Sequence, residues 1–164
     1  MTQPRLSIPK DQIDYILIGI GLIGVATMVG LTAFYYGQLP DQIPTHFNAA
    51  GQPDSYGEKS TLWFLVIAGI VIYSLILLVN RSPHLVNYSV PITDENAPRQ
   101  YHNLQRMNRS MAAIISLCIA YIVYAVIEMS LGDRESLGPW FVLLFIGIIF
   151  GIIGYYLYRA KVIE

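Results

Sequence analysis

The residues best suited to chemistry gather in one polar segment, Leu39 to Ser60. Its ionisable side chains are those of Asp41, His46, Asp54, Glu58 and Lys59. A histidine titrates near neutral pH, so His46 with carboxylates close by could bind a metal or sense pH. An exposed histidine is seldom a metal ligand without a second one nearby. The other interpretation is that His46 and Asp54 bond to each other and hold the shape of the segment.

We expect this segment to form a small, irregular hairpin. Three prolines and two glycines prevent a long helix, and the turn signal Ala50-Gly51-Gln52-Pro53 divides the segment into two short halves. The side chains predicted to contact a binding partner are Asp41, His46, Phe47, Asp54, Tyr56 and Lys59.

The elements that must position this hairpin are long apolar runs. The chain is 54% hydrophobic and 13% charged, whereas a soluble domain carries about 25% charged residues. Four runs are long enough to cross a hydrocarbon core of about 30 Å. We therefore expect membrane spans over residues 15–36, 62–79, 111–131 and 139–158. Residues 1–12 are interpreted as a short disordered lead.

These runs do not alternate apolar and polar residues, which excludes a transmembrane β-barrel. In lipid a continuous segment satisfies its own backbone polar groups only as a helix. The predicted fold is therefore an all-α integral membrane protein. It is a single membrane domain, residues 1–164, with a bundle of four transmembrane helices, an extracytoplasmic hairpin loop and a cytoplasmic amphipathic helix.

The Lys and Arg residues predict the orientation. The N-terminal lead, residues 80–110 and the C-terminal tail carry eight of the ten, whereas residues 37–61 and 132–138 carry two. By the positive-inside rule the side with eight is cytoplasmic. Both termini are then predicted to be cytoplasmic, and the outer motif loop, residues 37–61, faces outward.

Residues 93–110 predict the cytoplasmic amphipathic helix. Thr93, Asp94 and Asn96 are capping residue types, and Pro98 fits only a first turn. At about 100° per residue, one face carries Arg99, His102, Arg106 and Arg109. This basic face is predicted to contact anionic lipid headgroups or a partner; alternatively, its arginines only set the topology.

Small residues in the apolar runs predict helix packing. Gly19, Gly21 and Gly24 spell GxGxxG, but a nucleotide fingerprint needs a strand before it and an exposed turn, so we exclude that use. Gly147, Gly151 and Gly154 are predicted to pack against another helix, within the bundle or in a second copy of the chain.

Few side chains inside the predicted spans are reactive. Glu128 is the only acidic residue there, about one turn from a helix end, and either reaches the interface or marks a function. Cys118 is expected to be a packed apolar residue. No zinc-ligand spacing is present, and we expect no metal, no cofactor and no catalytic residue. The net charge of −1 gives no reason to expect a nucleic-acid partner.

The phrase LPDQIPTHFNAAGQPDSYGEKS resembles the signature of the domain-of-unknown-function 1648 family. The matching positions are Leu39, Pro40, Ile43, Pro44, His46, Phe47, Gly51, Asp54, Tyr56, Gly57 and Lys59, with Tyr56 where Trp is common. The resemblance implies a multi-pass protein of the bacterial cytoplasmic membrane. It also implies a distant likeness to larger, Sdp-type proteins that protect a cell from a secreted toxin.

Three functions follow as hypotheses. The first is a non-enzymatic recognition, immunity or sensing module that uses the outer segment, residues 39–60, to bind an extracellular peptide or small ligand. The second is an outer-face, metal-dependent hydrolase or other membrane enzyme that uses His46 with Asp41 or Asp54. The third is a small transporter, although the spans carry few polar groups to line an aqueous path. Expected partners are membrane lipid and a second copy of the chain.

Overall fold

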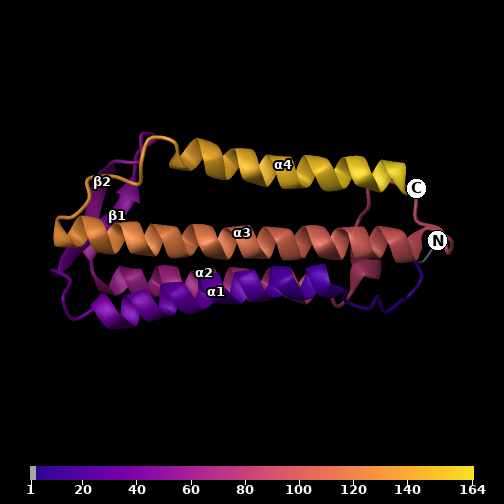
Figure 1. Cartoon of the computed structure of the whole chain (residues 1–164), viewed down its shortest axis with the longest axis horizontal. Helices are drawn as coiled ribbons and strands as arrows, with labels where there is room; N and C mark the ends of the chain where they lie inside the picture. The colour runs from indigo at the N-terminus through magenta and orange to yellow at the C-terminus, as the bar shows by residue number, and fades with distance from the viewer. Residues whose placement is uncertain (1–2) are drawn as a thin grey trace.

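Four long helices and one hairpin make up the computed structural model, which describes residues 3–164. The elements in chain order are α1 (Gln12–Tyr35), β1 (Gln42–Phe47), β2 (Pro53–Glu58), α2 (Ser60–Val79), the short 3₁₀ helix η1 (Pro83–Leu85), α3 (Ala97–Leu131) and α4 (Phe141–Val162). Figure 1 shows α3 along the middle of the molecule, with α1 and α2 on one side and α4 on the other. Each of the four helices is long and apolar enough to cross a membrane, which confirms the expected fold class.

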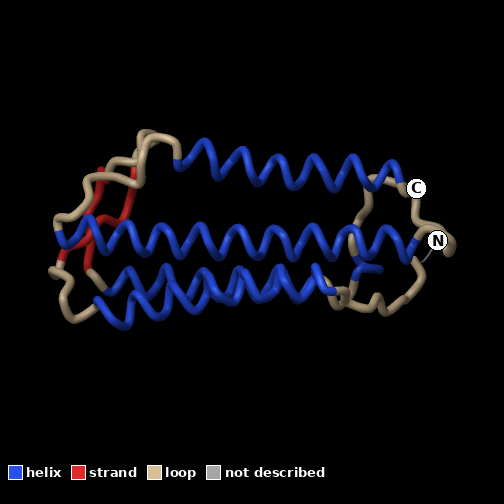
Figure 2. The backbone as a smooth tube through the Cα atoms, in the orientation of Figure 1, coloured by secondary structure: helices blue, strands red, loops and turns tan. Residues whose placement is uncertain are grey.

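The hairpin and the C-terminus lie at opposite ends of the bundle (Figure 2). The C-terminus and the first described residues are at one end, together with η1 and the start of α3. The hairpin is at the other end, beside the link between α3 and α4. This arrangement agrees with an even number of membrane crossings. It also places the polar side chains of the chain in two separate regions, one at each end of the bundle.

Helix α1 begins earlier than the predicted span because Asp11 caps it. The Asp11 side chain accepts the backbone N–H of Asp14, and the Asp14 side chain accepts the backbone N–H of Asp11, both at 3.1 Å. This capping box satisfies two N–H groups that the helix itself cannot pair.

The disordered lead predicted from composition is wrong for the described residues of that segment. Residues 3–10 form no helix or strand, and hydrogen bonds join the first two of them to the rest of the chain. The Tyr101 hydroxyl donates to the Pro4 carbonyl at 2.9 Å, and the Gln3 amide donates to the Val86 carbonyl at 3.1 Å. Tertiary hydrogen bonds, which composition does not reveal, hold this segment in place.

Helix α3 joins the predicted inner amphipathic helix and the predicted third span into one continuous element of 35 residues. Thr93 and Asn96 form a turn before it through reciprocal side-chain bonds of 3.0 and 3.2 Å. The helix ends at Gly132, whose φ of +89° suits glycine. At 1.5 Å per residue α3 is about 52 Å long, so its polar first half extends beyond the hydrocarbon core.

Glycines bring α1 close to its neighbours. A Cβ added at Gly24 would lie 2.8 Å from the Ser116 carbonyl carbon and 2.9 Å from the Leu117 nitrogen, both in the backbone of α3. Gly21 lies against the ring of Tyr73 in α2, whose hydroxyl donates to the Ile18 carbonyl at 3.0 Å. The predicted packing use of these small residues is therefore confirmed for Gly21 and Gly24, and a phosphate has no place beside them.

The hydrophobic core reaches from these helices into the hairpin. Leu39 and Ile43, which flank the start of β1, are buried with Leu62 of α2 and Val123 of α3. Strand β1 pairs with β2 in antiparallel register, and irregularities on both sides of His46 interrupt the ladder. The irregular hairpin predicted from the prolines and glycines is therefore confirmed, and its base is part of the helical core.

We expect Gly24→Ala to lower the free energy of unfolding by about 1–3 kcal/mol, because the new methyl group would overlap rigid backbone. Gly30→Ala is the matched control in the same helix, since nothing lies within 4 Å of an added Cβ there. Titration of the purified protein with SDS in mixed micelles measures both. Equal stability of the two variants would contradict the close approach of α1 and α3.

Candidate functional site

The hairpin brings His46 and Asp54 together. The ring Nδ1 of His46 donates to Asp54 Oδ1 at 2.5 Å. Both side chains are exposed, to 71% and 42%. The predicted bond between these two residues is therefore present. It engages Nδ1 of the ring. The other ring nitrogen, Nε2, has no hydrogen-bond partner among the described residues.

Asp41 takes a different partner. Its carboxylate lies 3.3 Å from Lys59 Nζ. Lys59 also donates to the Leu39 carbonyl at 3.4 Å, and its ammonium group lies 5.6 Å from the centre of the Tyr36 ring. The six predicted binding residues therefore divide into groups: His46 with Asp54 on the strands, and Asp41 with Lys59 at the base. Of the two carboxylates proposed to assist His46, only Asp54 contacts it.

The turn of the hairpin is anchored at its tip. The Asn48 side chain accepts the backbone N–H groups of Ala50 and Gln52 at 2.9 and 3.1 Å. Gly51 adopts a φ of +75°, and its carbonyl accepts the Leu137 N–H at 2.7 Å. The tip is therefore bound to the link between α3 and α4, so both the base and the tip of the hairpin are held.

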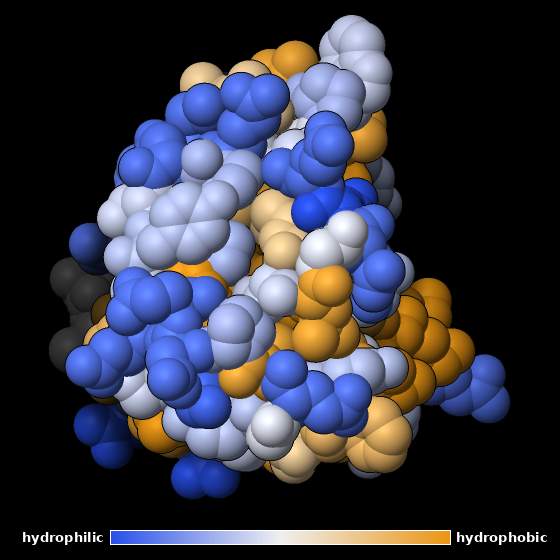
Figure 3. Space-filling model, turned by 90° about the vertical axis from the view of Figure 1, so that its left-hand side faces the viewer, coloured by the Kyte–Doolittle hydropathy of each residue, from blue (hydrophilic) through white to orange (hydrophobic). Residues whose placement is uncertain are grey.

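The two predicted aromatic contacts differ in exposure. Phe47 is partly buried and packs against the hydrophobic core. Tyr56 lies opposite Pro44 in the register and is 60% exposed. Figure 3 looks onto the hairpin end of the molecule, where hydrophilic residues cover most of the surface and apolar residues appear between them and along one side. The exposed surface of the hairpin therefore includes His46, Asp54 and Tyr56.

A second polar site lies at the opposite end, where α1 meets α3. Asp14 is fully buried. Its carboxylate lies 2.9 Å from Arg109 Nη1, 3.3 Å from Arg106 Nε and 3.4 Å from His102 Nε2. Asp11 at the start of α1 also bonds to Arg106. We call these five residues the inner ionic cluster: Asp11, Asp14, His102, Arg106 and Arg109.

The cluster changes the interpretation of the basic face of residues 93–110. Arg106 and Arg109 contact the Asp14 carboxylate of α1, and the Arg109 residue is only 3% exposed. A buried carboxylate needs such partners, because an unpaired charge in apolar surroundings is costly. Of the four predicted contacts, Arg99 is the one left exposed. The sequence did not reveal that the partners of these arginines are Asp11 and Asp14, the two aspartates of the capping box. Acidic residues at the start of an apolar helix were the signal that could have indicated them.

The charges of the cluster explain its ionisation and argue against a metal. The Asp14 backbone N–H, followed by Arg106, holds the pKa of Asp11 below its ordinary value of 3.8. Ligand atoms of Asp11, Asp14 and His102 lie within 4.8 Å of one another, which is close enough for a metal ion. Two guanidinium groups already engage these carboxylates, so a cation would have to displace them. The arrangement suits a structural ionic contact.

The glycines predicted to pack in α4 face away from the other described helices. Gly147, Gly151 and Gly154 are exposed, and nothing within 4 Å would meet an added Cβ. Packing within the bundle is therefore not their use, and contact with a second copy of the chain stays a prediction. Cys118 is buried, as expected. Glu128 is partly buried and lines none of five cavities found among the described residues.

We expect Asp14→Asn to lower the free energy of unfolding by about 3–5 kcal/mol, because it leaves the buried Arg109 without a compensating charge. Asp41→Asn is the matched control. It breaks an exposed ion pair, which is worth about 0–1 kcal/mol. SDS unfolding of both variants provides the measurement, and a loss at Asp14 no larger than that at Asp41 would contradict the structural role of the cluster.

Residues 23–77 match the family model described as domain of unknown function (DUF1648). The match covers the second half of α1, the whole hairpin and most of α2. A protein of Archaeoglobus fulgidus described as uncharacterised is 25% identical over an alignment of 144 residues, and the alignment covers 79% of this chain and 79% of that protein. No solved structure matches the chain significantly. The resemblance noted in the sequence is thus confirmed: in a chain with four helices long and apolar enough to cross a membrane, residues 23–77 are similar to the DUF1648 family.

Proposed function

We propose that the chain is a non-enzymatic recognition module of a bacterial cytoplasmic membrane, in which the outward-facing hairpin binds an extracellular peptide or small ligand. The observation that carries the proposal is a hairpin anchored at both base and tip that still exposes His46, Asp54 and Tyr56. Immunity to a secreted toxic peptide and sensing of such a peptide are the two roles that fit this surface.

Preorganisation supports recognition. A flexible loop loses conformational entropy when it binds a partner, whereas a loop already held in one shape does not. The Gly51–Leu137 bond and the buried Ile43 meet this requirement at the two ends of the hairpin. A tyrosine beside charged groups is also typical of the residues that contribute most to binding energy.

The outward orientation follows from the positive-inside rule and has a direct test. In a Cys118→Ala background, we expect Ala49→Cys in the hairpin to react with a membrane-impermeant maleimide on intact cells. Ser89→Cys, exposed at the opposite end, should react only after the cells are opened. Labelling of Ser89→Cys on intact cells, with Ala49→Cys protected, would contradict the orientation.

The functional test is a challenge of cells that lack the gene with culture supernatant from sibling cells. We expect the deletion to raise sensitivity and the unaltered gene to restore protection. Tyr56→Ala and His46→Ala should fail to restore it, because losing a residue central to an interface costs about 2 kcal/mol or more, roughly 30-fold in affinity.

Glu135→Ala is the matched control for this challenge, since it removes an exposed side chain from the neighbouring α3–α4 link. It should restore protection fully once membrane levels of all variants have been matched by immunoblotting. Unchanged sensitivity of the deletion strain, or full protection by both hairpin variants, would count against recognition by the hairpin.

A hydrolase is the second candidate because a carboxylate that orients a histidine is also the arrangement of a general base. His46 and Asp54 meet this condition. Asp54→Asn separates the two functions. It would lower hydrolytic turnover by several orders of magnitude, as expected when such a base loses its carboxylate, whereas binding through Tyr56 would persist.

A further inference from the structure

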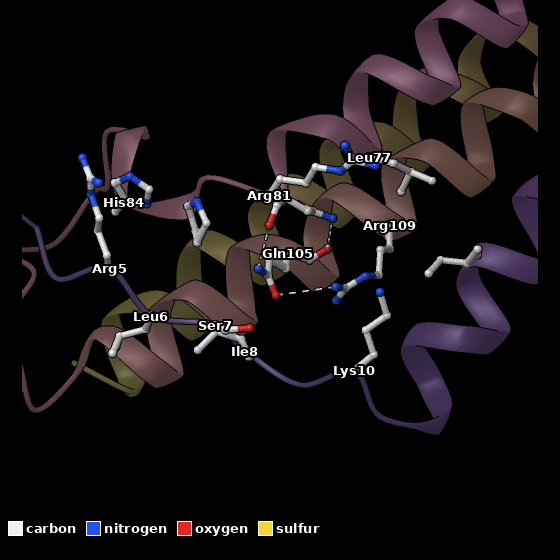
Figure 4. A pocket seen from close by; sticks show the side chains of 13 residues that line it. Arg5, Leu6, Ser7, Ile8, Lys10, Leu77, Arg81, His84, Gln105 and Arg109 are labelled. Carbon is white, nitrogen blue, oxygen red and sulfur yellow. Dashed lines mark hydrogen bonds between the residues drawn. The ribbon is translucent and has the colours of Figure 1, made fainter.

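A cavity of about 640 Å³ lies at the inner end of the bundle, away from the hairpin. Figure 4 shows its walls: the extended segment Arg5–Lys10, the end of α2 with η1, and the polar half of α3. Its volume is within the range of roughly 300–1,000 Å³ typical of small-molecule sites. The Asn80 and Gln105 side chains each donate to the other's backbone carbonyl, at 3.2 and 2.9 Å, and so hold α2 against α3 beside the cavity.

Every formally charged side chain that lines this cavity is cationic. They are Arg5, Lys10, Arg81 and Arg109, and His84 adds a fifth basic group. No carboxylate is among the lining residues. Within the described part of the chain, Arg5, Lys10 and Arg81 have no carboxylate within salt-bridge distance. Like charges that converge without a counter-ion repel one another, so an anion in the cavity would relieve this repulsion.

Arg109 shows that the cavity is more than a patch of surface lysines and arginines. The residue is only 3% exposed, and it comes from the wall formed by α3. Its Nη1 pairs with Asp14 at 2.9 Å, without the geometry of a hydrogen bond. In Figure 4 the Lys10 side chain extends toward this guanidinium group. A buried guanidinium group and a second cation therefore lie close together in the wall of the cavity.

The apolar residues that line the cavity indicate the chemistry of the rest of the ligand. Ile18 comes from α1 and Leu77 from α2, and both helices are membrane spans. Leu6 and Ile8 add apolar surface from the extended segment. A site that combines cationic groups with the apolar inner ends of two spans suits an amphiphile whose head is an anion and whose tails lie in the bilayer.

We propose that this cavity binds the phosphate of an anionic phospholipid, with Arg81 and Lys10 contacting the headgroup and Ile18 and Leu77 facing the acyl chains. Guanidinium groups suit phosphate because they can donate two parallel hydrogen bonds to it. The fold brings together basic residues that are far apart in the sequence, namely Arg5, Lys10, Arg81 and Arg109. Free phosphate shares the headgroup chemistry, but it would leave the apolar part of the site unused.

The test uses the full chain purified in dodecylmaltoside. Native mass spectrometry follows titration with dioleoylphosphatidylglycerol, dioleoylphosphatidylcholine and, separately, inorganic phosphate. We expect phosphatidylglycerol to bind more tightly than phosphatidylcholine or phosphate. The double variant Lys10→Gln/Arg81→Gln should bind phosphatidylglycerol at least about tenfold more weakly, because it loses charge-assisted hydrogen bonds to the phosphate.

The matched control is Arg99→Gln/Lys161→Gln. It removes the same charge from exposed positions at the same end of the molecule and outside the cavity. This control should bind phosphatidylglycerol as the unaltered chain does. Equal weakening of both double variants would mean diffuse surface attraction and would overturn the site. Equal binding of phosphatidylcholine, or of inorganic phosphate, would overturn the anionic lipid as its occupant.

Both double variants change exposed side chains, so unchanged SDS unfolding would show that they are folded. The hairpin variant Tyr56→Ala should bind lipid normally, because Tyr56 lies at the opposite end of the bundle. Failure of the lipid site and failure of hairpin recognition are therefore distinguishable.

Discussion

A carboxylate with no contact with water ties the first helix to the third. Asp14 sits in the first turn of α1, and its charge is balanced only where Arg106 and Arg109 of α3 face it. Any other rotation of α1 would leave an unpaired charge in apolar surroundings, which is far more costly than a lost van der Waals contact. Together with Gly24, which allows the two backbones to touch, this contact sets both the rotation and the register of the helix pair.

That contact in turn positions the two ends of the molecule. Because α1 is locked against α3, the chain leaving α1 enters β1 beside the end of α3, where Ile43 joins Val123 in the core. At the other end, the segment that precedes α1, Arg5–Lys10, lies beside α3 and forms one wall of the basic cavity. One pairing of charges within the bundle therefore contributes to both polar regions, although they are at opposite ends of it.

Helix α4 packs less closely against α3 than α1 does. Near its end the Gln100 and Asn103 side chains of α3 donate to the Ala160 and Tyr156 carbonyls at 2.7 and 2.9 Å. Near its start Tyr121 stacks on Phe141, with ring centres 4.9 Å apart. Between these contacts an apolar groove of about 470 Å³ separates α3 and α4. The DUF1648 match ends before α3, so α4 lies outside the matched unit of helix, hairpin and helix.

The amino-acid sequence by itself determined the four spans, because lipid demands about 20 apolar residues per helix, and it determined the hairpin, because prolines and glycines exclude other structures there. It also identified Gly24 as a packing residue and His46 with Asp54 as a pair. These properties depend on composition and on neighbours close along the chain. Only the tertiary structure decided which charges meet, since Asp14 and Arg106 are 92 residues apart. A helical pattern shows which residues share a face, but not which surface that face packs against, so it did not reveal that Arg109 pairs with a buried aspartate.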